Sequence, residues 1–141
     1  MSRPPVSEHT NGGMHARVLV VDDDAEMRTL LRRILEFDGF RVTERDRGTH
    51  VLAALRETPF DLIILDKEMP EMTGLDLLPA LRREFPRVPV LLVTAFGGRQ
   101  VESSALRLGA TSYLEKPFRL SQFREVVDDL LANPPQGSQA S

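Results

Sequence analysis

Carboxylates follow two of the most apolar segments of this chain. Four large aliphatic residues, 62–65, run directly into Asp66, and apolar residues 18–21 run into an acidic triplet that begins at Asp22. A strand buried on both faces has no place for an unpaired charge, so we expect each carboxylate at the carboxyl end of its strand. An aspartate in such a position is a candidate nucleophile, because carboxylates are known to accept phosphoryl groups.

A repeated strand–helix pattern must position these residues. Apolar residues at helical spacing predict helices, and short apolar runs bounded by Gly or Pro predict strands. We expect the following elements: strands at about 18–21, 40–45, 60–66, 90–93 and 111–114, and helices at about 25–37, 48–57, 74–81, 99–108 and 120–131. Strands that alternate with helices indicate an α/β fold with a doubly wound, five-stranded parallel sheet.

The strand order follows from how polar each strand is. Strands 40–45 and 111–114 are the least apolar, so we place them at the edges, which gives the order 2-1-3-4-5 of a flavodoxin-like (βα)5 fold. The topological switch point of that order lies between the first and third strands, where ligands bind in such sheets. Asp22, Asp23 and Asp66 should therefore meet at one edge.

Three carboxylates at one edge require a cation. Two unit charges about 4 Å apart repel by about 4 kcal/mol at an effective dielectric constant of about 20. Asp22, Asp23 and Asp66 offer only oxygen ligands, and the chain has no Cys. A hard divalent ion is therefore expected, with Mg²⁺ as the best fit and Mn²⁺ as an alternative.

Two further strand ends carry groups suited to a phosphoryl oxygen. Thr94 ends the fourth strand and offers a hydroxyl, and Lys116 follows the fifth strand and offers an ammonium group. Taken singly, Thr94 is more often a turn residue and Lys116 a solvated surface lysine, and a helix cap is an equally good interpretation of Asp24. Their coincidence at one edge favours a shared chemical role.

These residues stand in segments that resemble the receiver domain of response regulators, the chemotaxis-regulator-like module of two-component phosphorelays. The resemblance covers about residues 17–132, and no single segment carries it alone. The matching segments are Val18-Leu19-Val20-Val21-Asp22-Asp23, Leu65-Asp66-x-x-Met69-Pro70-x-x-x-Gly74, Val93-Thr94-Ala95 and Gly109-Ala110-x-x-Tyr113-Leu114-x-Lys116-Pro117-Phe118.

The resemblance implies a phosphoryl acceptor beside a metal site. Asp66 would accept the phosphoryl group from a histidine kinase or a small phosphodonor. Asp22 and Asp23 would form the acidic pair that holds Mg²⁺ together with Asp66, with Asp23 the more direct ligand. The backbone carbonyl of Glu68 would be a further ligand. The protein would catalyse only its own phosphorylation and dephosphorylation, and would not turn over an external substrate.

The resemblance also implies a switch. Thr94 and Lys116 would bind the phosphoryl group, the Lys116–Pro117 bond would be cis, and Tyr113 would swing inward as Thr94 moves. The alternative for Tyr113 is a rim aromatic packed on helix 99–108. The switching surface would be helix 99–108, strand 111–114 and the last helix, which could also form a homodimer.

The rate at which the phosphoryl group is lost is a separate expectation. Glu68 and Phe96 each stand two residues after a site residue, at positions that tune dephosphorylation in the family. An acid and a bulky aromatic there would impede an attacking water, so we expect slow self-hydrolysis, with a phosphoryl lifetime longer than seconds.

Two other functions compete with this interpretation. Asp22-x-Asp24 after an apolar strand resembles the nucleophile motif of haloacid-dehalogenase phosphohydrolases, but Glu26 stands where that motif usually has Thr or Val. The second rival is a binding module with this fold and no phosphorylation. Replacement of Asp66 should abolish covalent labelling in a receiver, and replacement of Asp22 should do so in the phosphohydrolase.

Composition limits the partners and the location. The net charge of −3 gives no basic footprint for nucleic acid, so no direct nucleic-acid binding is expected, and no apolar run suits a membrane span of about 18 residues. The lack of Cys fits a reducing cytoplasm.

We expect a disordered leader at 1–16, one domain at 17–132 and a flexible tail or linker at 133–141. A sensor histidine kinase and an unidentified downstream protein or effector domain are the expected partners.

Overall fold

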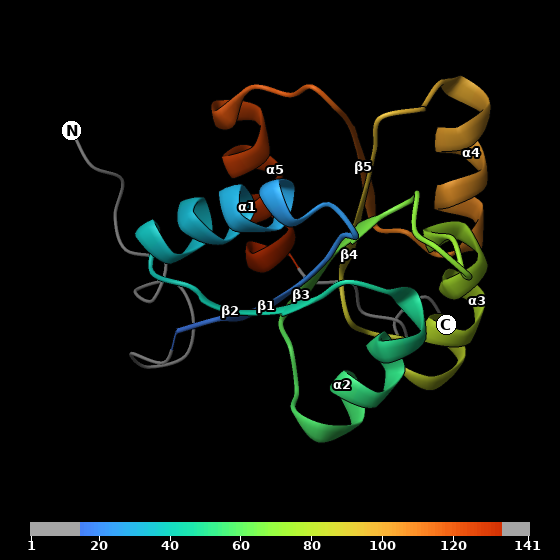
Figure 1. The fold of residues 1–141 in the computed structure, drawn as a ribbon, viewed down its shortest axis with the longest axis horizontal. Coiled ribbons are helices and arrows are strands. Elements are labelled where there is room, and N and C mark those ends of the chain that lie inside the picture. The colour runs from blue at the N-terminus through green and yellow to red at the C-terminus, as the bar shows by residue number, and fades with distance from the viewer. Residues whose placement is uncertain (1–14, 134–141) are drawn as a thin grey trace.

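The computed structural model describes residues 15–133, in which five strands alternate with helices (Figure 1). The predicted leader, apart from its last two residues, and the predicted tail after residue 133 lie outside the described residues. The elements are β1 Arg17–Val21, α1 Ala25–Phe37, β2 Arg41–Arg45, a 3-10 turn Gly48–His50, α2 Val51–Glu57, β3 Leu62–Asp66, α3 Gly74–Glu84, β4 Val90–Thr94, α4 Arg99–Leu108, β5 Ser112–Glu115 and α5 Leu120–Ala132.

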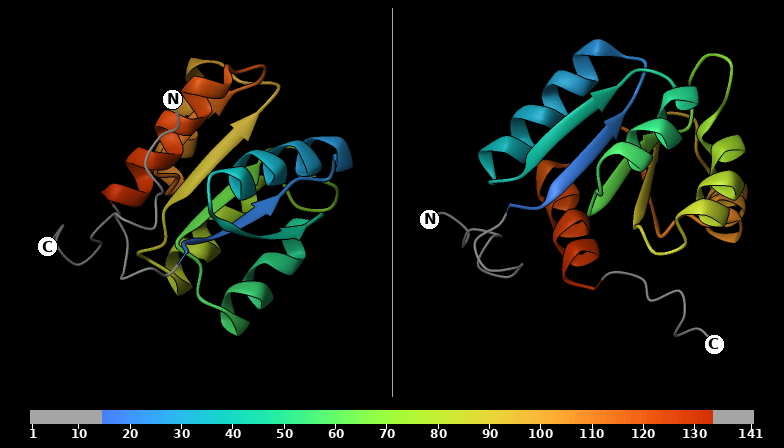
Figure 2. Two further views of the ribbon diagram at one scale, coloured as in Figure 1. Left: turned by 90° about the vertical axis from the view of Figure 1, so that its left-hand side faces the viewer. Right: turned by 90° about the horizontal axis from the view of Figure 1, so that it is seen from below.

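The five strands form one parallel sheet in the order β2-β1-β3-β4-β5, which confirms the predicted fold class and strand order. The arrows in Figure 2 point the same way, so the carboxyl ends of the strands share one edge. Every residue of β3 and β4 is buried, whereas β2 has no buried residue and β5 has one. The polar strands therefore lie where one side of the strand has no neighbour.

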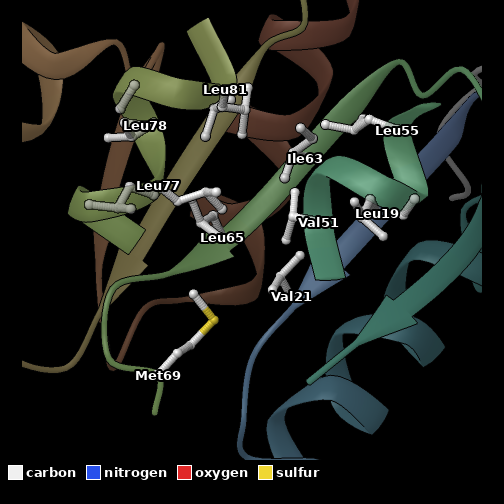
Figure 3. Packing of buried hydrophobic residues seen from close by; sticks show 14 of the residues in the cluster. Leu19, Val21, Val51, Leu55, Ile63, Leu65, Met69, Leu77, Leu78 and Leu81 are labelled. Carbon is white, nitrogen blue, oxygen red and sulfur yellow. The ribbon is translucent and has the colours of Figure 1, made fainter. Parts of the chain in front are cut away.

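Helices cover both faces of the sheet. α1 and α5 lie on one face, and α2, α3 and α4 lie on the other (Figures 1 and 2). Successive side chains of β1 alternate between the two layers, with Val18 and Val20 facing α1 and α5, and Leu19 and Val21 facing α2 and α3 (Figure 3). Each fully buried aliphatic side chain contributes about 1.5–3 kcal/mol to folding, so both layers stabilise the sheet.

Several element boundaries differ from the prediction, among them the end of α3, which runs to Glu84 instead of residue 81. The third strand begins at Leu62 instead of residue 60, because Asp61 turns its carboxylate to the Arg17 backbone N–H at 2.8 Å. The predicted helix 48–57 is divided into a 3-10 turn and α2. The fifth strand lies one residue later than expected, at Ser112–Glu115. The first and third strands end where they were predicted to end, and Lys116 now directly follows the fifth strand.

Two helix starts hold the loops around the site. Asp24 caps α1 by accepting from the Glu26 backbone N–H, so its carboxylate is used as a cap. Thr73 and Asp76 form a reciprocal capping box at the start of α3, with bonds of 3.1 and 3.3 Å. A Cβ on Gly74 would stand 2.6 Å from the Asp66 carbonyl oxygen, so glycine is required for this close approach.

Among the described helices, none is long and apolar enough to cross a membrane.

Candidate functional site at the carboxyl edge of the sheet

Three carboxylates meet where β1 and β3 end. Asp22 directly follows β1 and Asp66 is the last residue of β3, and the pairing of Val21 with Leu65 places the two strand ends side by side. Asp22, Asp23 and Asp66 each offer a carboxylate oxygen, and these oxygens all lie within 4.8 Å of one another. Asp22 and Asp66 are only 2% and 3% exposed, whereas Asp23 is exposed.

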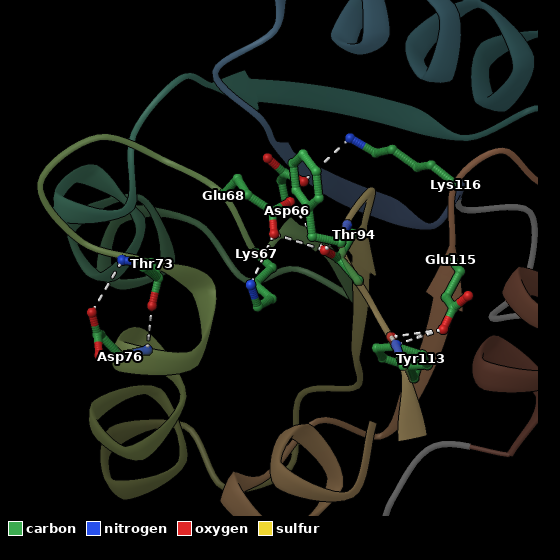
Figure 4. Close-up of polar contacts among 11 residues, drawn as sticks. Asp66, Lys67, Glu68, Thr73, Asp76, Thr94, Tyr113, Glu115 and Lys116 are labelled. Atoms are coloured by element: carbon green, nitrogen blue, oxygen red, sulfur yellow. Dashed lines mark hydrogen bonds and ion pairs between the residues drawn. The ribbon is translucent and has the colours of Figure 1, made fainter. Parts of the chain in front are cut away.

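Lys116 joins this group from the far edge of the sheet (Figure 4). Its Nζ lies 3.2 Å from Asp22 Oδ2 and 3.2 Å from Asp66 Oδ1, although these residues are 94 and 50 positions away in the chain. Lys116 follows β5, and the Lys116–Pro117 peptide bond is cis, as the resemblance implied. One ammonium group therefore bridges two buried carboxylates.

The charges at the site perturb one another. Burial raises the pKa of Asp66 to about 7, and the neighbouring charge of Asp22 adds to this, while Lys116 opposes it. The pKa of Asp22 is also raised, chiefly by burial, against the opposing effects of the Asp24 backbone N–H and Lys116. Burial disfavours the charge on Lys116, but Asp66 and Asp22 outweigh it and raise the pKa of the ammonium group. The group carries an excess of negative charge that Lys116 alone does not neutralise.

Thr94 ends β4 and is fully buried. Its Oγ1 lies 2.8 Å from Glu68 Oε2 and 3.0 Å from Oε1, so the hydroxyl donates to the Glu68 carboxylate (Figure 4). The Phe96 backbone N–H donates to the same Oγ1 at 3.0 Å. Lys67 Nζ lies 2.9 Å from Glu68 Oε2. Thr94 thus lies at the predicted edge, with its hydroxyl bonded to a carboxylate of the neighbouring loop.

Tyr113 is bonded to the loop between β4 and α4. Its hydroxyl lies 3.1 Å from Glu115 Oε2 and accepts from the Gly98 backbone N–H at 3.1 Å. The ring packs against the core layer formed with α2, α3 and α4. A Cβ on Gly97 would lie 2.0 Å from the Tyr113 hydroxyl oxygen, so this contact needs glycine at 97. Phe96, in the same loop, is 70% exposed.

Arg28 contacts the site, and the sequence analysis did not predict it. From the first turns of α1 it donates through Nη1 to the Asp22 backbone carbonyl at 2.6 Å, and its Nε lies 3.1 Å from Glu44 Oε1. The contact ties the loop after β1 to α1 and β2. The sequence signal that could have pointed to Arg28 is its position one helical turn after the Asp24 cap.

The donor set fits a hard divalent cation. Asp22, Asp23 and Asp66 present carboxylate oxygens within reach of a single ion, and Mg²⁺ takes oxygen ligands from one or two carboxylates while keeping several waters. The excess of negative charge described above is a second reason for a cation at this edge. The structure is therefore consistent with divalent metal binding, and the choice between Mg²⁺ and Mn²⁺ rests on the chemistry of the ligands.

Comparison with known proteins gives this fold and site a family. Residues 18–128 match the family model described as the response regulator receiver domain. The chain is 36% identical over 116 residues to the transcriptional regulatory protein ZraR of Salmonella typhimurium, which covers 82% of this chain and 26% of that protein. It is 42% identical over 115 residues to the transcriptional activator protein PfeR of Pseudomonas aeruginosa, covering 82% and 37%.

Solved structures agree with this assignment. The chemotaxis protein CheY4 of Vibrio cholerae matches with a TM-score of 0.79 and 30% identity, over 84% of this chain and 100% of that one. The five-stranded parallel α/β sheet of this chain thus has the fold of a chemotaxis-type receiver. The chain belongs to the response regulator receiver domain family. It spans about a quarter of the length of ZraR and about a third of that of PfeR.

Proposed function

We propose that Asp66 accepts a phosphoryl group and thereby switches the protein between two states. The observation that carries this proposal is the position of Lys116 Nζ, 3.2 Å from carboxylate oxygens of both Asp66 and Asp22. A receiver needs a buried carboxylate nucleophile, and it needs a cation beside that carboxylate to bind the incoming anion. Asp66 and Lys116 supply these two groups.

The transfer is a displacement at phosphorus. An ionised Asp66 oxygen attacks the phosphorus of a phosphohistidine on a sensor kinase, or of a small phosphodonor such as acetyl phosphate. A new O–P bond forms as the P–N or P–O bond to the donor breaks, and the donor leaves with the bonding electron pair. Lys116 offsets charge on the phosphoryl oxygens, and Thr94 donates its hydroxyl to one of them.

A divalent ion completes the site in this proposal. Asp22, Asp23 and Asp66 would hold Mg²⁺ or Mn²⁺, together with the backbone carbonyl of Glu68. When bound, the ion neutralises charge on the phosphoryl group and helps to align it for attack. Magnesium dependence is supported by the all-oxygen donor set and by the closeness of the three carboxylates.

The output of the switch would be the surface formed by α4, β5 and α5. Movement of Thr94 towards the phosphoryl group frees space beside β5, and Tyr113 must then leave its contacts with Glu115 and Gly98 to turn inward. This surface could bind a downstream protein, an effector domain or a second copy of the chain. A sensor histidine kinase is the proposed donor and the cytoplasm the proposed location, both by analogy with the family.

Covalent labelling tests the proposed function. The protein is incubated with acetyl phosphate and Mg²⁺, and its intact mass is compared with that of Asp66→Ala and Asp22→Ala variants. We expect one added phosphoryl group on the wild type, none on Asp66→Ala, and slow but measurable labelling of Asp22→Ala. Labelling that survives in Asp66→Ala and disappears in Asp22→Ala would favour the phosphohydrolase. A wild type that gains no mass and binds no beryllofluoride would favour the unphosphorylated binding module.

A further inference from the structure

The carboxylate of Glu68 accepts the hydrogen bond of the Thr94 hydroxyl, which the proposed function assigns to the phosphoryl group. Thr94 Oγ1 lies 2.8 and 3.0 Å from the two Glu68 oxygens (Figure 4). A hydroxyl has one proton to donate, and the Phe96 N–H already donates to Oγ1. Thr94 therefore has no second donor to offer while Glu68 is in place.

Several groups hold the Glu68 side chain in this position. Lys67 Nζ lies 2.9 Å from Oε2, and the Ala95 backbone also hydrogen-bonds the carboxylate. Burial raises the pKa of Glu68, but the contacts with Lys67 and Thr94 outweigh it and leave the pKa below its ordinary value. With the Lys67 ammonium group 2.9 Å away, the Glu68 carboxylate accepts charge-assisted hydrogen bonds, which are stronger than neutral ones.

We propose that the Glu68 carboxylate is an internal competitor of the phosphoryl group, which holds Thr94 in the unphosphorylated position until the anion on Asp66 displaces it. The inference rests on the proposed function. A carboxylate and a phosphoryl group both present anionic oxygens to the same hydroxyl, so the two ligands exclude each other at Thr94. Glu68 acts through Thr94, and is a positioning residue in this respect.

The competition has a measurable consequence for the balance between the two states. Each state contributes its own hydrogen bond to Thr94, and a ligand shifts an equilibrium only by its differential interaction with the two states. Without the Glu68 carboxylate, the state before anion binding loses its bond to Thr94, and a weaker ligand suffices to recruit the hydroxyl. The protein should then reach the switched state at a lower anion concentration.

Charge repulsion between Glu68 and the bound anion is the competing explanation. The hydroxyl of Thr94 distinguishes it from the internal competition. The Glu68 charge contributes to the raised pKa of Asp66, so its removal would favour any anion at this site. Repulsion acts whether or not Thr94 has a hydroxyl. The internal competition, by contrast, disappears when the hydroxyl is removed, which makes a double-mutant cycle decisive.

The experiment titrates beryllofluoride, a phosphoryl mimic, in the presence of Mg²⁺ and follows the backbone amide signals by ¹H–¹⁵N NMR. Four proteins are compared: the wild type, Glu68→Ala, Thr94→Ala and the double variant. We expect Glu68→Ala to lower the half-saturating concentration about tenfold in the wild-type background, which corresponds to about 1.4 kcal/mol. In the Thr94→Ala background the same change should have less than a twofold effect.

Two further variants sharpen the outcome. Glu68→Gln keeps an acceptor oxygen but loses the charge, so its half-saturating concentration should fall between those of the wild type and Glu68→Ala. Glu26→Gln removes an exposed negative charge from the first turn of α1 and should change binding less than twofold. Circular dichroism confirms that each variant is folded.

An equal effect of Glu68→Ala in both Thr94 backgrounds would overturn the internal competition and leave simple repulsion. No effect in either background would overturn it as well. A wild-type protein that shows no saturable response to beryllofluoride at any Mg²⁺ concentration would refute the proposed function itself, and with it the internal competition at Thr94. The failure of the two proposals is thus distinguished by the behaviour of the wild type.

Discussion

Replacement of Asp66 by Asn should stabilise the metal-free protein above pH 7. With carboxylate oxygens no more than 4.8 Å apart and an effective dielectric constant of about 20, the Asp66 charge is repelled by Asp22 and Asp23 by at least about 3.5 kcal/mol each, or about 7 kcal/mol together. Its attraction to Lys116 at 3.2 Å recovers about 5 kcal/mol. The difference is about 2 kcal/mol, and solvent around the exposed Asp23 reduces it, so we expect a gain of about 1–2 kcal/mol.

The pH dependence gives this prediction its sign. Because the pKa of Asp66 is raised from 3.8 to about 7 in the folded protein, the folded state binds the proton more tightly than the unfolded chain. The contribution of Asp66 to stability is therefore complete below about pH 4 and is lost as the pH rises through about 7. The advantage of Asp66→Asn should be largest at pH 8 and at most half as large at pH 5.

Urea denaturation with EDTA, at pH 5 and pH 8, measures both quantities. Added Mg²⁺ should stabilise the wild type more than the variant, because the variant has lost one of the three carboxylates. The reasoning would be refuted if Asp66→Asn were less stable than the wild type at pH 8, or if its advantage were the same at both pH values.

Four further perturbations test other parts of the structure. Lys116→Met leaves two buried carboxylates without their partner and should cost about 3–5 kcal/mol at pH 8 in urea denaturation, and less at pH 5, where Asp66 takes up a proton; an equal cost at both pH values would contradict this. Tyr113 is the only tyrosine and the chain has no tryptophan, so acrylamide quenching of intrinsic fluorescence reports this side chain alone. Quenching should fall when beryllofluoride and Mg²⁺ are added, and unchanged quenching would argue against an inward swing. Gly97→Ala places a Cβ against the Tyr113 hydroxyl and should raise quenching in the unliganded protein, with the fold retained by circular dichroism. Phe123→Ala removes a fully buried ring that stacks on a neighbouring ring, with the ring centroids 5.5 Å apart. The change should lower the free energy of unfolding by about 3–5 kcal/mol in thermal or urea denaturation, and a loss below about 1 kcal/mol would contradict the described core.

The fold could be predicted from the sequence because buried positions carry apolar residues and exposed positions carry polar ones. Residues 62–65 and 90–93 are apolar on both faces since helices cover both sides of β3 and β4. β2 carries polar residues because one of its edges has no neighbouring strand. The start of β3 was less predictable, since the contact of Asp61 with the Arg17 backbone depends on a residue 44 positions away.

The site was predictable only in part. The sequence places Asp22, Asp66 and Lys116 at strand ends, and parallel pairing brings strand ends to one edge, so the approach of these residues follows from topology. The side-chain contacts of loop residues do not. Glu68 bonds Thr94 because its rotamer is fixed by Lys67 and by the loop after β4, and no periodicity in the chain encodes that rotamer. The bond of Tyr113 to Gly98 has the same character.

Chemical mapping of the phosphoryl group tests the central claim most directly. The protein is phosphorylated with acetyl phosphate and Mg²⁺, and the acyl phosphate is reduced with borodeuteride, which converts a phosphorylated aspartate to deuterated homoserine. Peptide mass spectrometry then locates the product. The account predicts homoserine at position 66, and none when Mg²⁺ is removed with EDTA. Homoserine at position 22 or 23, with position 66 unmodified, would contradict it.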